Sequence, residues 1–450
     1  MAPAAITPES SGTSTPTTAT ASSLTQAGIK HTQQQQPTTS NGHATQLATL
    51  DASRMTVQLT DSPRPVPDPT GAETKAQKTC TDHMVTARWT VEHGWEAPEL
   101  KPYGAFSIMP SASVLHYATE CFEGLKLYRG HDGRLRLFRV RRNCERMRNS
   151  AKRIALPDFE ARELERMIVA LCARDGPKWL PKERAGSFLY IRPTMIGTDS
   201  ALGVQRPQEA LLYVIIACFP DMSQSLAAAP PALSGEADGK AKQQTSGLKL
   251  LASAEDTIRA WPGGFGYAKL GANYGPSLVA QGEARARGFD QVLWLYSDDA
   301  QQNLVTEAGA SNFFVVLRNK DTSRLELITA PLNQRIILEG VTRASVLDLA
   351  KERLATATAG GIEAVEVVER RFTMGELKAA RKDGRFVEAF AAGTAFFIAP
   401  VGLIHFRGED IDVPMDGDSG VYARLIKQWL TNIMYGKVAH EWGVVVDETG

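Results

Sequence analysis

The sequence has 450 residues, of which 43% are hydrophobic and 22% charged, ordinary values for a globular enzyme of two or three domains. Its 50 basic and 50 acidic side chains give a formal net charge of zero, so no overall field attracts nucleic acid or an anionic membrane. The longest apolar run, Leu211–Pro220, is too short to span a bilayer and predicts a buried strand.

Residues 1–78 are rich in Ser, Thr, Gln, Pro and Ala and poor in large apolar side chains. Such a segment cannot bury a core, which predicts a disordered low-complexity extension. A mitochondrial presequence is the alternative, because the stretch is Ser-rich and poor in acids. However, Lys30 is its only Lys or Arg before Arg54. We therefore predict a cytoplasmic location, with the mitochondrial matrix as the alternative.

Order is predicted to begin near Thr81, and residues 79–219 to form a small α/β domain. Leu135–Val140 and Phe188–Pro193 have the composition of strands. Asp158–Arg174 has apolar residues near helical spacing and acids near its start, which predicts an amphipathic helix.

Residues 220–247 are rich in Ser, Ala, Pro, Gly and Lys, which predicts a linker or insertion. Residues 248–450 are predicted to form a larger α/β domain, so the fold class is mixed α/β (α+β) in two domains with a tail. Its expected strands are Gln291–Tyr296, Phe313–Leu317 and Ala395–Pro400, and its expected helices are Thr342–Lys351 and Val421–Tyr435.

Cysteines and histidines limit the chemistry. The five cysteines are odd in number, widely spaced and without a Cys-x-x-Cys motif, which argues against disulfides and a zinc site. A reducing compartment is the simplest interpretation. The eight histidines are scattered without a His-Glu-x-x-His motif, so we expect no metal.

Three windows poor in charge stand out. In residues 260–282 the only charged side chain is Lys269. Burial lowers the pKa of a lysine and makes the neutral amine accessible, as a Schiff-base lysine requires. A surface lysine on a glycine loop is the alternative.

In the second window, residues 300–317, the only charge is Glu307. Enzymes that use pyridoxal phosphate (PLP) pair such an acid with the ring nitrogen; an acid in an exposed turn is the alternative. The third window, residues 389–406, has no charge and contains Gly393-Thr394-Ala395. This turn, and Gly340-Val341-Thr342 at a helix start, are suited to binding an anion, or are a plain turn and a plain cap.

In order and spacing the sequence resembles the branched-chain aminotransferases, PLP enzymes of fold type IV, from about Thr81 to Val446. The motifs that carry the resemblance are His-Tyr-Ala-Thr-Glu-Cys-Phe-Glu-Gly (116–124), Asn-Cys-Glu-Arg-Met (143–147), Leu-Tyr-Ile-Arg-Pro (189–193), Gly-Tyr-Ala-Lys-Leu-Gly-Ala-Asn-Tyr-Gly (266–275), Thr-Glu-Ala-Gly (306–309), Glu-Gly-Val-Thr-Arg (339–343) and Gly-Thr-Ala (393–395).

The resemblance implies a role for each matching residue. Lys269 would form the imine with PLP, Glu307 would bind the ring nitrogen, and Tyr274 would bind the phenolic oxygen. The phosphate would be held by Arg146, Val341, Thr342 and Thr394. The substrate's carboxylate end would be met by Tyr117, Tyr190, Arg192 and the Thr394–Ala395 turn, and Phe122 would line the side-chain pocket. From the residues alone, Arg146 also fits a solvated basic face, and Tyr117 and Phe122 fit a core.

The segment 197–204 resembles the loop that reaches a partner's site through Leu202 and Val204, which implies a homodimer. Three departures from the family affect these expectations. Ala310 replaces a threonine, and Cys218-Phe-Pro-Asp-Met-Ser replaces a segment that supplies a tyrosine, so the substrate range is open. Phe396 and Ala399 replace a redox Cys-x-x-Cys of animal members.

The implied function is ping-pong transfer of the amino group between L-leucine, L-isoleucine or L-valine and 2-oxoglutarate, giving branched 2-oxo acids and L-glutamate. A specialised-pathway, D-amino-acid or amine transaminase of the same fold type is the first alternative. A non-catalytic binding module is the second, and the presence of both Lys269 and Glu307 argues against it.

Overall fold

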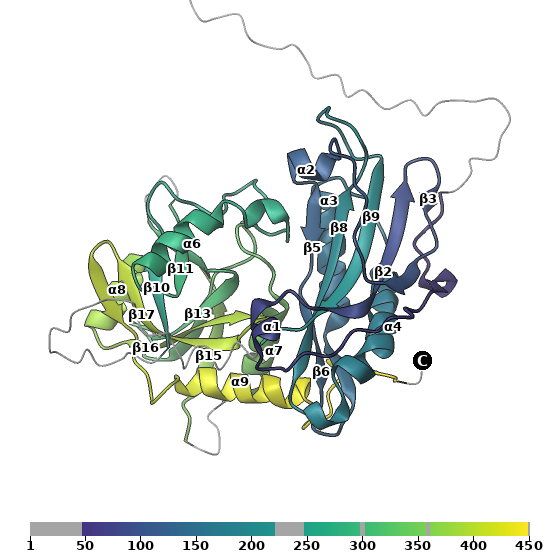
Figure 1. The fold of residues 1–450 in the computed structure, drawn as a ribbon. Coiled ribbons are helices and arrows are strands. Elements are labelled where there is room, and N and C mark those ends of the chain that lie inside the picture. Colours follow the sequence, from purple (N-terminus) through teal and green to yellow (C-terminus); the bar gives the residue numbers. More distant parts are fainter. Residues whose placement is uncertain (1–46, 221–246, 298–301, 357–360, 449–450) are drawn as a thin grey trace, which may run out of the picture. The chain divides into compact units, whose positions relative to one another are not determined.

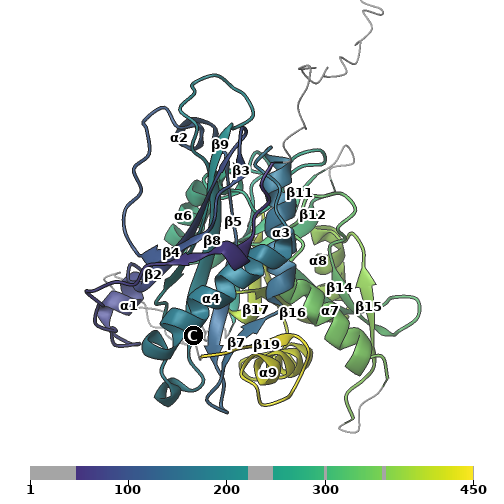
Figure 2. The same ribbon diagram turned by 90° about the vertical axis from the view of Figure 1, so that its right-hand side faces the viewer.

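Two β-sheets with helices on their faces make up the described part of the chain (Figure 1; Figure 2). This computed structural model describes residues 47–220, 247–297, 302–356 and 361–448. The predicted mixed α/β fold class is confirmed.

The first sheet has the strand order β1-β4-β2-β9-β8-β6-β7-β19, with β3 attached to β2 and β5 to β8. Its strands are β1 (Thr56–Val57), β2 (Cys80–Thr90), β3 (Gly94–Trp95), β4 (Glu99–Pro102), β5 (Glu120–Phe122), β6 (Leu125–Arg129), β7 (Leu135–Phe138), β8 (Phe188–Gly197), β9 (Glu209–Ala217) and β19 (Gly443–Val446). All of these pairings are antiparallel except that of β1 with β4.

The helices of this half are η1 (Ala52–Arg54), α1 (Ala72–Ala76), α2 (Ser113–Tyr117), α3 (Val140–Arg153), α4 (Ala161–Trp179) and η2 (Lys182–Arg184). Figure 2 shows α3 and α4 lying across one face of the sheet. The apolar stripe of α4 is fully buried against the strands, which is why this sequence forms a helix there. That stripe is Leu164, Met167, Ile168 and Leu171.

The second sheet has the order β12-β11-β10-β17-β16-β13-β14-β15, with β18 attached to β17. Because β13 also pairs with β12, the strands from β12 round to β13 close into a ring. The strands are β10 (Leu248–Ala252), β11 (Gln291–Tyr296), β12 (Leu304–Ala308), β13 (Ser311–Arg318), β14 (Leu325–Thr329), β15 (Val365–Glu369), β16 (Phe386–Gly393), β17 (Phe397–Phe406) and β18 (Glu409–Asp412). The helices are η3 (Gly271–Asn273), α6 (Ser277–Ala286), α7 (Val341–Arg353), α8 (Met374–Lys382) and α9 (Val421–Met434).

The predicted elements exist, but several bounds differ. The strand expected at 135–140 ends at Phe138, because Arg139 has a left-handed φ of 48° and α3 begins directly after it. The strand expected at 395–400 begins at Phe397, since the residues before it form the hairpin turn.

The strands of the first sheet come mainly from residues 79–219, and those of the second sheet come entirely from residues 248–450. The division into two domains stays a prediction. Of the predicted linker, residues 221–246 lie outside the described residues.

The predicted disordered extension is wrong for residues 47–78, while residues 1–46 lie outside the described part of the chain. Leu50 is buried in the core of the first sheet. The N–H of Ala52 donates to the Glu163 carboxylate at 2.8 Å. The segment has too few apolar residues for a core of its own, but its backbone hydrogen-bonds to surfaces that the rest of the chain supplies.

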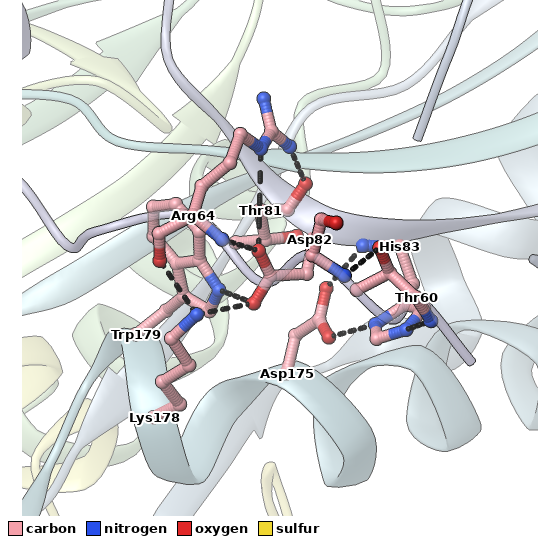
Figure 3. A network of polar contacts seen from close by, with 9 residues as sticks. Thr60, Arg64, Thr81, Asp82, His83, Asp175, Lys178 and Trp179 are labelled. Carbon is pink, nitrogen blue, oxygen red and sulfur yellow. Dashed lines mark hydrogen bonds and ion pairs between the residues drawn. The ribbon is translucent and has the colours of Figure 1, made fainter. Parts of the chain in front are cut away.

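Two adjacent residues of β2 fasten this N-terminal segment to α4 (Figure 3). Asp82 accepts from the Arg64 N–H at 2.8 Å, from Lys178 at 2.7 Å and from the Trp179 indole at 2.9 Å. His83 Nδ1 lies 2.7 Å from the Asp175 carboxylate, and its Nε2 accepts from the Thr60 N–H at 3.1 Å. A backbone donor at Nε2 requires that nitrogen to be unprotonated, so the proton of the neutral imidazole lies on Nδ1.

Candidate active site

Lys269 lies in a loop that β5 holds in place. The Phe122 N–H donates to the Lys269 carbonyl at 3.1 Å, and the Lys269 N–H donates to the Ser150 hydroxyl at 2.8 Å. The half-buried side chain then directs Nζ to the Tyr274 hydroxyl, at 2.8 Å. Nζ also lies 4.7 Å from the centre of the Phe122 ring. The lysine is therefore fixed at both ends and is not a free surface residue.

Glu307 is buried on β12, and a tight hairpin sets its environment. Gly309, with a φ of 56°, and Ala310 form the two-residue turn between β12 and β13, and the positive φ is typical of such turns. This register pairs Glu307 with Asn312, whose Nδ2 donates to Oε1 at 3.1 Å. The Leu338 N–H donates to the same oxygen at 3.2 Å.

An ion pair with Arg259 completes the contacts of Glu307. Arg259 follows β10, and its side chain is 11% exposed. Burial raises the pKa of Glu307, whereas the positive charge of Arg259 opposes that shift. Arg259, Glu307, Tyr274 and Ala310 line one cavity of about 140 Å³.

Arg146 projects from α3 and is held by a second buried acid, Glu123. Its Nε and Nη2 donate to the two carboxylate oxygens at 2.7 and 2.8 Å, and its Nη1 donates to the Glu339 carbonyl at 2.9 Å. An arginine has five N–H donors, so one donor on each terminal nitrogen remains for a ligand. Arg146 is thus an oriented group and not part of a solvated basic face.

The other predicted anion-binding residues gather beside this pair. Val341 and Thr342 form the first turn of α7, where backbone N–H groups have no partner within the helix. They line one small cavity together with Thr394, and Val341 also lines the adjacent cavity of Arg146. The structure therefore brings Arg146, Val341, Thr342 and Thr394 into one region.

The Thr394–Ala395 turn is held from β6. Lys126 is buried between the rings of Phe188 and Phe397, at 3.8 and 4.4 Å, and donates to the Ala395 carbonyl at 2.9 Å. Thr394 Oγ1 lies 3.4 Å from the carbonyl of Gly124. These contacts fix the tip of the hairpin between β16 and β17.

Three of the predicted substrate residues lie together on β5 and β8. The Arg192 guanidinium lies 4.8 Å from the Phe122 ring, and its Nη2 donates to the Tyr190 hydroxyl at 3.0 Å. Gly124 allows this arrangement, because a Cβ there would overlap the Tyr190 hydroxyl. Since Phe122 also contacts the Tyr274 ring at 5.0 Å, this group adjoins Lys269.

Tyr117, Leu202 and Val204 lie elsewhere. The Tyr117 hydroxyl donates to the Leu202 carbonyl, and both side chains are exposed. Val204 is 86% exposed. Figure 1 shows α2, which ends at Tyr117, at one end of the first sheet. Within this chain Tyr117 contacts Leu202, and Val204 is exposed two residues further along.

The sequence prediction missed Arg259, Glu123, Asn312 and Lys126. Arg259 stands one residue before the charge-poor window that drew attention to Lys269. Glu123 lies within the motif 116–124, and Asn312 lies three residues after the motif 306–309. Both are polar residues among apolar ones, a pattern that indicates a buried group with a polar partner. Lys126 lies two residues after the motif 116–124 and is likewise a polar residue among apolar ones.

The described residues show features of neither a metal site nor a membrane span. No cluster of three or more His, Cys, Asp or Glu side chains suited to a metal ion occurs there. No described helix is long and apolar enough to cross a bilayer. The five cysteines are buried and unpaired.

Comparison with known proteins extends over most of the chain. Residues 120–404 match the family model of amino-transferase class IV. The cytosolic branched-chain-amino-acid aminotransferase of Saccharomyces cerevisiae is 42% identical over 408 residues, which is 89% of this chain and 99% of the relative. The mitochondrial enzyme of the same yeast is 40% identical over 404 residues, covering 89% and 94%.

A crystal structure of the branched-chain amino acid aminotransferase of Thermobaculum terrenum, in its PLP-form, has the same fold. It matches with a TM-score of 0.56 and 21% identity, covering 81% of this chain and 98% of that one.

Proposed function

This chain belongs to the class IV aminotransferases, among the branched-chain-amino-acid aminotransferases, and from that premise we propose that it moves the amino group between L-leucine, L-isoleucine or L-valine and 2-oxoglutarate with PLP as cofactor. The proposal rests mainly on one arrangement of side chains. Lys269 Nζ lies 2.8 Å from the Tyr274 hydroxyl, and Tyr274 lines the same cavity as the buried Glu307. An amine, a phenol and a buried carboxylate thus meet beside one cavity.

The residues present fit each group of PLP. Lys269 would supply the amine for the aldehyde, and Tyr274 a hydroxyl for the phenolic oxygen. Glu307 would supply a carboxylate for the ring nitrogen. When bound, PLP supplies a ring that withdraws electrons from the substrate's α-carbon. The structural neighbour from Thermobaculum terrenum, described in its PLP-form, supports this cofactor.

The phosphate would lie against Arg146 and the first turn of α7. The two unused donors of Arg146 can form charge-assisted hydrogen bonds. The N-terminus of α7 at Val341 and Thr342 favours an anion. Thr394 adds a hydroxyl from the opposite hairpin. All four residues of the predicted phosphate site are thus assigned to one proposed site.

Lys269 would also move the proton. Lys269 would act as the general base when its amine is free. Its Nζ would take the proton from the substrate's α-carbon and deliver it to the carbon of the cofactor that had carried the aldehyde. Tyr274 orients Nζ throughout, because its hydroxyl is already within hydrogen-bond distance.

Phe122, Tyr190, Arg192 and the Thr394–Ala395 turn are proposed to receive the substrate. An aliphatic side chain that covers Phe122 and Tyr190 removes apolar surface from water, at about 25 cal/mol per Å². Phe219 stacks on Tyr190 at 4.5 Å in the segment where this chain departs from its family. Because the same segment lacks the tyrosine that the family supplies, we propose a wider pocket, in which Phe or Met donors are used better than is usual for the family.

The exposed group of Tyr117, Leu202 and Val204 is proposed to complete the site of a second copy in a homodimer. The support is its exposure, because these three large side chains at one end of the sheet stay uncovered by the described part of the chain. We also propose a cytoplasmic location, with the mitochondrial matrix as the alternative. The two yeast relatives are named as cytosolic in one case and mitochondrial in the other.

The test is a panel of amino donors with 2-oxoglutarate as acceptor, scored by kcat/KM. L-leucine, L-isoleucine and L-valine should lead, and Lys and Arg should be rejected because no acid is assigned to meet their charge. Discrimination between Val and Ile should be mild, since one methylene is worth about 1–3 kcal/mol. A D-amino acid, an aromatic or a cationic donor far ahead of all three would remove the branched-chain assignment.

A further inference from the structure

Arg259 is a buried cation to which the proposed function gives no role. Its Nη2 forms an ion pair with Glu307 Oε2. The same nitrogen lies 3.4 Å from the Gly266 carbonyl oxygen and 3.3 Å from that of Ile336. No described residue accepts a hydrogen bond from its buried Nε. Nη2 is thus the nitrogen that makes the polar contacts of this guanidinium, with one carboxylate and two carbonyls.

The acceptor positions of Glu307 can be counted. An ionised carboxylate offers about four. Asn312 Nδ2 and the Leu338 N–H occupy those of Oε1, and Arg259 occupies one on Oε2. Among the described contacts, one position on Oε2 remains. The ring N–H of the cofactor would therefore donate to the oxygen that Arg259 already contacts.

We infer that Arg259 is a positioning residue, which keeps Glu307 ionised so that the proton between Glu307 and the cofactor stays on the ring nitrogen. This inference rests on the proposed function and deepens it. The carboxylate and the ring nitrogen compete for one proton. A guanidinium is always charged, and in contact with a carboxylate it favours the ionised form. The ring withdraws electrons most strongly while its nitrogen holds the proton.

The other charges near Glu307 are already engaged. Burial raises the pKa of Glu307 above its usual value, and the opposing effects of Arg259, the Leu338 N–H, Lys269 and Arg343, in that order, reduce this shift without reversing it. Lys269 donates to Tyr274, and Arg343 pairs with Glu369 at 2.7 Å. Within the described residues Arg259 is the cation that contacts Glu307. Without Arg259, burial would be the main influence on the pKa of Glu307.

The first experiment reads the proton directly in the holoenzyme. The protein is loaded with PLP labelled with nitrogen-15 in the ring, and the ring signal is recorded by NMR. We expect a protonated nitrogen in the parent and in Arg259→Lys, and an unprotonated one in Arg259→Met. A protonated signal in Arg259→Met would overturn the inference. Arg259→Gln serves the same purpose if the methionine variant does not fold.

The second experiment needs no cofactor. Infrared spectra of the full-length, cofactor-free protein follow the Glu307 carboxyl with pH, and Glu307→Gln identifies its band. Arg259→Met should raise the midpoint by about one to three pH units. Arg318→Met, which removes an exposed ion pair between the end of β13 and Glu363, should leave the midpoint unchanged.

An unchanged midpoint in Arg259→Met would overturn the inference. The two experiments also separate the two claims. If the parent bound no PLP, the proposed function would fail, and the infrared titration would still decide whether Arg259 holds Glu307 ionised.

Discussion

Replacement of Glu123 by glutamine tests whether a buried ion pair shapes the phosphate site. The Glu123 side chain is 1% exposed and binds both Nε and Nη2 of Arg146, as well as Asn143 Nδ2 at 2.9 Å. The substitution keeps the size of the side chain but leaves a nearly buried guanidinium without its counter-ion. Removing one partner of such a pair costs about 3–5 kcal/mol of the free energy of unfolding.

Glu363→Gln is the matched control. Glu363 binds Arg318 through two equally short contacts, at 2.8 and 2.9 Å, but the two side chains are 50% and 38% exposed. Exposed pairs contribute about 0–1 kcal/mol. The two ion pairs have similar distances and differ mainly in burial. The comparison therefore measures how burial changes the contribution of an ion pair to the free energy of unfolding.

The assay is urea denaturation of the cofactor-free variants at one fixed protein concentration, followed by titration with PLP. Glu123→Gln should lower the denaturation midpoint far more than Glu363→Gln. It should also weaken PLP binding, because Arg146 loses the contacts that would point its free donors at the phosphate in the proposed site. Equal midpoints for the two variants, or parent-like PLP affinity in Glu123→Gln, would refute the reasoning.

Three further predictions concern other parts of the molecule. Glu307→Gln should still bind PLP, because the phosphate site is intact, but should lose most of kcat, since an amide cannot hold the ring proton; near-normal turnover would exclude this role. Deletion of residues 1–46 should leave the melting temperature and specific activity unchanged, whereas deletion of residues 1–60 should lower the melting temperature, because it removes buried Leu50; equal melting temperatures would contradict the anchoring. Val204→Asp should weaken self-association and raise KM, as measured by analytical ultracentrifugation and steady-state kinetics; an unchanged dimer with unchanged KM would exclude the proposed contact.

The sequence was informative where one residue carries the chemistry. Lys269 and Glu307 stand out because each is the only charge in a long window poor in charge. A lone charge among apolar residues has to be paired or functional. That argument needs no knowledge of which segments meet in space. The structure places both residues beside one cavity, Glu307 in its lining and Lys269 through its contact with Tyr274.

Partners that are distant in sequence could not be predicted in the same way. Arg259 and Glu307 are in contact although they lie 48 positions apart in the sequence, and Arg146 and Glu123 are in contact although they lie 23 positions apart. In the sequence Arg146 belongs to a basic run, and only the packing of α3 turns it inward while Arg142 stays exposed. Leu50 shows the same limit for folding, because its core is supplied by residues far along the chain.

The most direct test of the central claim is to identify the residue that binds the cofactor. The purified full-length protein is incubated with PLP, reduced with borohydride, digested, and examined by mass spectrometry. The account predicts that the label lies on the peptide containing Lys269, and that Lys269→Ala loses both the label and turnover. A label on a different lysine, such as the buried Lys126, or no label at all, would contradict it.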